Sequence, residues 1–136
     1  KRYQVLSPSD FGFHNALWEK SGTLRVIDLE YFGWDDPVKL ASDFWWHPAM
    51  KLEQPLRQQW ISGMHGVFSE DQDFANRLKV AHPLYGLRWA MIVLKPFLSQ
   101  ERVSTNREQI LQNQLRKSMM FCDYGNDWVE CGNQQF

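Results

Sequence analysis

The residues of this sequence best suited to chemistry are three polar side chains near its start, Asp10, Asn15 and Asp28. Asp10 and Asn15 follow the order D-x-x-x-x-N, a spacing that lets one loop carry a base carboxylate and a metal-binding amide. Asp28 ends an apolar run, Val26-Ile27, where a metal-binding carboxylate is expected. Mg²⁺ prefers one or two carboxylates together with a neutral oxygen and waters. The chemistry that these residues would do is phosphoryl transfer, with Asp10 as the base.

A β-hairpin is the element expected to bring these side chains together. Segments 15–19 and 24–29 are predicted to pair, because the turn between them contains a permissive glycine, Gly22. Asn15 and Asp28 would then flank the strand pair at the end away from the turn, which predicts one shared site. A surface turn with self-bonding polar side chains, or a strand-end carboxylate that caps a turn, is the structural alternative.

The remainder of the sequence is typical of helices, and a brief strand is expected at 3–6. The predicted fold class is therefore α+β and mostly α, a short hairpin followed by about five helices in a single domain, 1–136. Helix starts are indicated by proline at a first helical position and by capping boxes. These helices are expected from Pro37 to about Trp46, from Pro55 with Leu56, Trp60, Met64 and Val67 on one face, from Ser69, across 84–98, and from Thr105.

Composition narrows the function classes. A net charge of −1 gives no basic field for nucleic acid. The longest apolar run, 89–94, is far too short for a membrane span. Two cysteines and no visible signal peptide favour a reduced, cytoplasmic chain. Seven Trp and nine Phe indicate a heavily packed core, with sugar or base stacking as the alternative.

The residues after Asp28 extend the pattern. Gly33, Asp36-Pro37 and 39–44 are similar to the segment that follows the metal aspartate in the aminoglycoside phosphotransferase and choline kinase-like family, which has a protein-kinase-like fold. The family's catalytic loop reads H-G-D-x-x-x-x-N and its metal loop I-D-x-x-x-x-G-x-x-D-P. Ser9-Asp10 with Asn15 resembles the first loop, and Ile27-Asp28 begins the second.

This resemblance implies a role for each residue. Asp10 would be the catalytic base, Asn15 and Asp28 would hold Mg²⁺ and through it ATP, and Asp43 would be a buried carboxylate that braces the catalytic loop. The implied activity is ATP- and Mg²⁺-dependent phosphorylation of a hydroxyl on a small molecule such as an aminoglycoside, a choline-like amine or a sugar. The chain would be the C-terminal lobe alone. The N-terminal ATP lobe would then be a missing partner, and the isolated chain is expected to be inactive.

The sequence departs from the family pattern in the catalytic loop. Pro8 replaces the family's histidine, and Gly12 stands where a polar or basic residue is common. The nearest base is His14, for which a structural hydrogen bond is favoured over a phosphate contact. Asp10-Phe11-Gly12 also spells the D-F-G of protein kinases, but too few residues precede it to supply their catalytic loop.

Two other functions remain open from the sequence. A non-catalytic kinase-like binding or regulatory module is favoured by Pro8 and Gly12, and a helical interaction domain is a third interpretation. An acidic groove for a cationic substrate could be lined by Glu70, Asp71 and Asp73. The start of a solvated helix is the favoured interpretation of these residues, because carboxylates stabilise a helix N-terminus.

Overall fold

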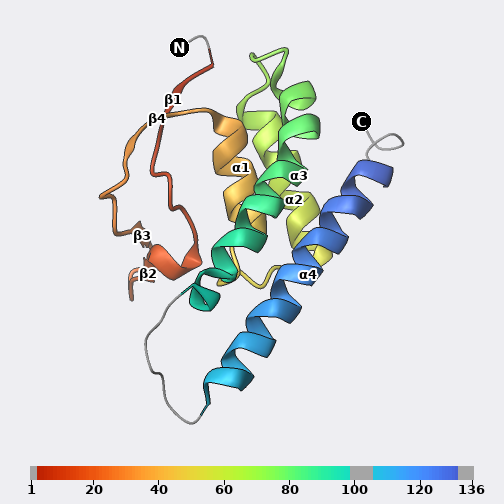
Figure 1. Cartoon of the computed structure of the whole chain (residues 1–136). Helices are drawn as coiled ribbons and strands as arrows, with labels where there is room; N and C mark the ends of the chain where they lie inside the picture. Colours follow the sequence, from red (N-terminus) through yellow and green to blue (C-terminus); the bar gives the residue numbers. More distant parts are fainter. Residues whose placement is uncertain (1–2, 99–105, 132–136) are drawn as a thin grey trace. The chain divides into compact units, whose positions relative to one another are not determined.

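The computed structural model describes residues 3–98 and 106–131, which contain four α-helices and two small sheets (Figure 1). The chain divides between Ala81 and His82 into two compact units. Within the described ranges, none of the helices combines the length and the apolar character needed to cross a membrane. The α+β, mostly helical class expected from the sequence is confirmed.

Both sheets are antiparallel strand pairs in the first unit. β2 (Ala16–Trp18) pairs with β3 (Leu24–Val26), so the predicted hairpin is confirmed with shorter strands. Gly22 adopts a φ of 83°, the left-handed conformation that its place in the turn requires. β1 (Val5–Ser7) corresponds to the strand expected at 3–6, and it pairs with β4 (Gly33–Asp35), which the sequence did not predict.

Helix α1 (Pro37–Trp46) has the predicted bounds. The Asp36 carboxylate accepts a hydrogen bond from the Val38 N–H at 2.9 Å and caps the first turn. At the other end the His47 N–H donates to the Asp43 carbonyl at 2.8 Å. The helix supplies much of the unit's buried apolar core: Val38, Ala41, Phe44, Trp45 and Trp46. Core packing rather than sugar stacking is thus confirmed for the two tryptophans in this helix.

Helix α2 (Gln54–Val67) begins one residue before the predicted proline. Its predicted apolar face is confirmed only in part. Met64 is buried as expected, whereas Leu56 is 51% exposed and Val67 is 73% exposed. The other buried apolar residue of the helix is Ile61. Trp60 links α2 to α1, because its Nε1–H donates a hydrogen bond to the Ala41 carbonyl at 2.9 Å.

The predicted helices from Ser69 and across 84–98 form a single helix, α3 (Phe74–Val93), with Pro83 inside it. Ser69 lies in a turn rather than at a helix start, because the Asp71 carboxylate accepts the Asp73 N–H at 3.1 Å and delays the helix. A short 3₁₀ turn, η2 (Lys95–Phe97), follows at Pro96. Helix α4 (Arg107–Cys131) starts close to the predicted capping box, whose Thr105 lies outside the described residues.

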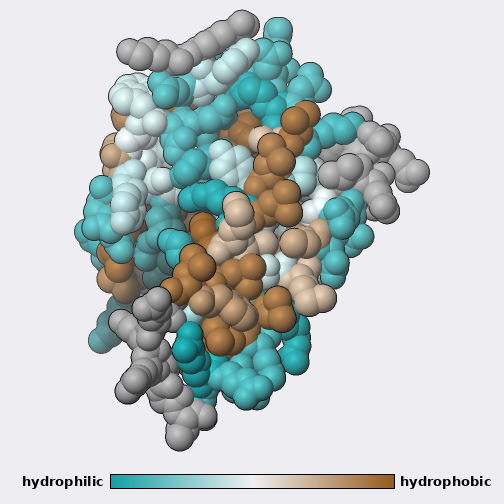
Figure 2. All heavy atoms as spheres, in the orientation of Figure 1, coloured by the Kyte–Doolittle hydropathy of each residue, from teal (hydrophilic) through white to brown (hydrophobic). Residues whose placement is uncertain are grey.

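An apolar stripe is exposed along α3. Its residues recur at helical spacing, so they lie on one face of the helix. Figure 2 shows hydrophobic side chains gathered along this helix. The exposed fractions are 70% for Val80, 61% for Leu84, 48% for Leu87 and 66% for Met91.

In the second unit, the His82 ring lies 4.0 Å from the Trp128 ring, centroid to centroid. Cys122 and Cys131 both belong to α4, nine residues apart.

Candidate functional site

The loop that carries Asp10 is anchored by its two phenylalanines. The Phe11 ring stacks on Phe44 of α1 at 5.6 Å and on Trp60 of α2 at 6.1 Å, while Phe13 meets the edge of Phe44 at 5.7 Å. The two phenylalanines alternate with Asp10 and His14 along the loop, and their rings attach the loop to α1 and α2. The alternation leaves Asp10 on the solvent side, with 43% of its side chain exposed.

Both carboxylate oxygens of Asp10 have partners. The Asn15 side-chain Nδ2–H donates to the Asp10 carbonyl at 3.0 Å and to Asp10 Oδ2 at 3.3 Å. His14 Nε2 lies 3.2 Å from Asp10 Oδ1. The D-x-x-x-x-N spacing thus closes into a turn in which a buried amide orients an exposed carboxylate. The structural hydrogen bond expected for His14 is observed.

At the open end of the hairpin, the backbone of Asn15 is bonded to Ile27, the residue before Asp28. The Ile27 N–H donates to the Asn15 carbonyl at 2.9 Å, directly beyond the last paired strand residues. Asp28 is exposed and has a φ of 60°. Such left-handed backbone is uncommon for a residue with a side chain, and it often accompanies functional sites.

The pKa of the exposed Tyr31 phenol is raised, first by its hydrogen bond to Glu30 and by that carboxylate's charge, and least by the charges of Asp28 and Asp10.

Asp43 is linked to the loop that carries Asp10 through a lysine. Lys39 Nζ lies 3.3 Å from Asp43 Oδ2 and 3.0 Å from Asp35 Oδ2. The same ammonium donates to Ser9 Oγ at 2.6 Å. Ser9 takes the place of the glycine in the pattern H-G-D-x-x-x-x-N, and its φ is 61°. The bracing role predicted for Asp43 stays a prediction, and Lys39 is the connection that the structure adds.

His47 is the site residue that sequence reasoning missed. It follows α1, and its ring stacks on His14 with a centroid distance of 4.0 Å and an interplanar angle of 2°. His47 Nε2 lies 4.0 Å from Asp10 Oδ1. The pKa of His47 is lowered by burial and by the charge of His14, against the opposing charges of Asp10 and Asp43. No local motif joins residues 10 and 47, so the sequence carried no signal for this cluster.

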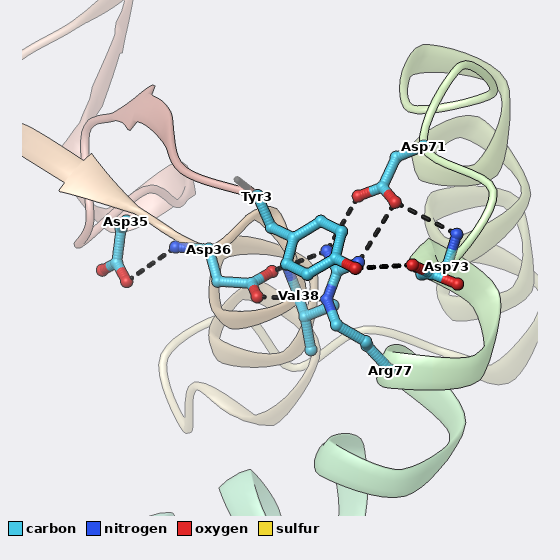
Figure 3. Close-up of polar contacts among 7 residues, drawn as sticks. All are labelled: Tyr3, Asp35, Asp36, Val38, Asp71, Asp73 and Arg77. Carbon is cyan, nitrogen blue, oxygen red and sulfur yellow. Dashed lines mark hydrogen bonds and ion pairs between the residues drawn. The ribbon is translucent and has the colours of Figure 1, made fainter. Parts of the chain in front are cut away.

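The acidic residues at 35–36 and 71–73 have structural partners (Figure 3). Arg77 Nη2 lies 2.8 Å from Asp71 Oδ2, and Arg77 Nε lies 3.2 Å from Asp36 Oδ2. The Tyr3 ring covers the guanidinium at 3.9 Å, and the Tyr3 hydroxyl donates to Asp73 at 2.5 Å. Asp36 acts as the predicted helix cap, and the contacts of Asp71 and Asp73 favour internal bonding over a groove for a cationic substrate.

Comparison of the chain with protein-family models, curated proteins and solved structures gives no match.

Proposed function

We propose that this chain carries the catalytic and metal-binding loops of an ATP- and Mg²⁺-dependent phosphotransferase that acts on a hydroxyl group of a small molecule. The supporting observation is the double role of Asn15. Its side chain hydrogen-bonds Asp10, and its carbonyl accepts from Ile27, the residue before Asp28. A base carboxylate, an amide and a second carboxylate therefore come from adjoining backbone, and phosphoryl transfer uses all three.

The donor atoms of the proposed metal ligands fit Mg²⁺. Because Asn15 Nδ2 donates to Asp10, Oδ1 of the same amide is left as its ligand atom. Asp28 adds an exposed carboxylate. A neutral oxygen and a carboxylate, completed by waters and substrate phosphates, are the ligands that Mg²⁺ prefers. When bound, the ion would supply neutralisation of the phosphate charge of ATP.

Asp10 is the proposed base. It would take the proton of the substrate hydroxyl as that oxygen bonds to the γ-phosphorus and the bond between the γ-phosphorus and ADP breaks. The contacts with His14 and Asn15 orient the carboxylate, and its partial exposure leaves it within reach of a substrate. Orientation of this kind is the main contribution that a protein makes to phosphoryl transfer.

The test uses the full-length protein that carries this sequence. Thermal denaturation with and without MgATP measures nucleotide binding, and ADP release is then followed with an aminoglycoside, choline and a sugar as acceptors. We expect MgATP to raise the melting temperature and one acceptor class to stimulate ADP release. Binding of MgATP without turnover on any acceptor would contradict the catalytic proposal and favour a non-catalytic kinase-like module.

A further inference from the structure

A cluster of metal-ligand side chains combines two residues of the proposed catalytic loop, Asp10 and His14, with His47, which the mechanism above does not use. Asp10, His14 and His47 each offer one ligand atom, and these atoms all lie within 4.8 Å of one another. The cluster draws on two separate parts of the chain, the loop before the hairpin and the end of α1. Two imidazole nitrogens and one carboxylate oxygen are a donor set for divalent transition ions.

Packing holds the cluster in place before any ligand arrives. The two imidazoles are stacked in parallel, and only 21% of the His14 side chain and 16% of the His47 side chain are exposed. The ring of His14 lies over Gly12, where an added Cβ would come within 2.5 Å of Cε1. Gly12, a departure from the family pattern, is therefore needed for this position of His14. The Phe13 N–H also approaches Met50 Sδ at 3.2 Å, which ties the loop to the segment after α1.

The donor atoms are chemically ready for a transition ion. A histidine binds metal through a neutral imidazole nitrogen. His14 and His47 each present such a nitrogen within 4.8 Å of the other and of the Asp10 carboxylate. Of the three ligand side chains, that of Asp10 is the most exposed, with 43% of it accessible. The open side of the cluster thus faces solvent, from which an ion and its remaining water ligands would come.

One contact opposes binding and limits its strength. The Ala49 N–H donates to His47 Nδ1 at 3.2 Å, which places the proton of the neutral ring on Nε2. Coordination through Nε2 moves this proton to Nδ1 and gives up the hydrogen bond from Ala49. Loss of one such bond weakens binding by roughly tenfold.

We propose that Asp10, His14 and His47 form a binding site for a divalent transition-metal ion of the zinc class. The ligand set is two imidazoles and one carboxylate, and water completes the coordination. This site is separate from the Mg²⁺ site proposed on Asn15 and Asp28, because it offers nitrogen donors where Mg²⁺ requires oxygens. The inference does not rest on the phosphotransferase proposal. If both hold, a zinc-class ion occupies the carboxylate needed as base and inhibits phosphoryl transfer.

The experiment is calorimetric titration of the protein with Zn²⁺ at neutral pH, with Mg²⁺ as the comparison ion. Two variants remove a ligand, His14→Gln and His47→Gln, and circular dichroism confirms that each is folded. His65→Gln is the matched control, because His65 lies on α2 outside the cluster. Cys122→Ser removes a free thiol of α4 as an alternative ligand.

We expect one Zn²⁺ per chain and no comparable binding of Mg²⁺. Each ligand variant should weaken Zn²⁺ binding by roughly tenfold or more, while the His65 and Cys122 variants bind as the unaltered protein does. Absence of Zn²⁺ binding at about 100 µM would overturn the proposal. Binding that both ligand variants retain, or that depends on Cys122, would overturn it equally.

Discussion

Asp10 is the residue on which the proposed chemistry depends. Its carboxylate is oriented by His14 and Asn15 and still has 43% of its side chain exposed. The partnership with Asn15 was predictable, because five residues of separation within one loop bring the two side chains together. The position of His47 near Asp10 was not predictable, because it depends on where α1 ends relative to the loop that carries Asp10.

The Mg²⁺ assignment makes a prediction at Asp28. In the full-length protein, Asp28→Ala should raise the Mg²⁺ concentration required for MgATP binding by roughly tenfold or more, because a charged ligand of the ion is lost. Titration of MgATP binding with Mg²⁺ measures this. Glu30→Gln is the control, since it removes an exposed carboxylate two positions away and should leave the requirement unchanged. An unaltered Mg²⁺ requirement in Asp28→Ala would show that the ligand is elsewhere.

The buried position of His47 makes a second residue-scale prediction. Its pKa in the folded state is lowered from 6.5 by burial and by His14, against Asp10 and Asp43, so the unfolded state binds the proton more readily. The neutral His47 ring therefore stabilises the folded state. This stabilisation is fully present above pH 6.5 and is lost as the pH falls below it. We expect His47→Gln to flatten the fall in stability on the acid side. Urea unfolding at several pH values measures this, and an identical pH profile in the variant would contradict it.

At the scale of elements, the sequence predicted best the helix ends that local residues determine. Both ends of α1 were predicted from Asp36-Pro37 and His47-Pro48, because a capping side chain and a proline limit a helix without distant partners. The hairpin followed from its turn glycine. β4 was missed because it forms only against β1, nearly thirty residues earlier. The capping box at Ser69 was misleading because Arg77 and the Asp73 N–H use the Asp71 carboxylate instead.

Arg77 joins several of these elements, which gives a stability prediction. It pairs with the cap of α1 and with the turn before α3, under the ring of Tyr3 (Figure 3). Arg77→Met should lower the free energy of unfolding by about 1–3 kcal/mol, because it leaves two part-buried carboxylates without their cation. Chemical denaturation measures the change. Lys20→Met, at an exposed turn, is the matched control, and equal stabilities for the two variants would contradict the role given to Arg77.

At the scale of the whole molecule, the site belongs to one compact unit. Asp10, Asn15, Asp28, Asp43 and His47 all precede the division at Ala81 and His82. The sequence indicated the mostly helical class from its caps and periodicity, and the structure bears this out. It could not indicate the merging of two predicted helices into α3, because a proline such as Pro83 ordinarily ends a helix.

The most direct test of the account replaces Asp10 by alanine in the full-length protein that carries this sequence. MgATP binding and ADP release with the best acceptor are measured on the same preparation, beside the Glu30→Gln control. We expect Asp10→Ala to abolish turnover and to leave MgATP affinity largely intact, because the proposed base would contact the acceptor hydroxyl rather than the nucleotide. Turnover that Asp10→Ala retains at the level of the control would contradict the assignment of Asp10 as the base.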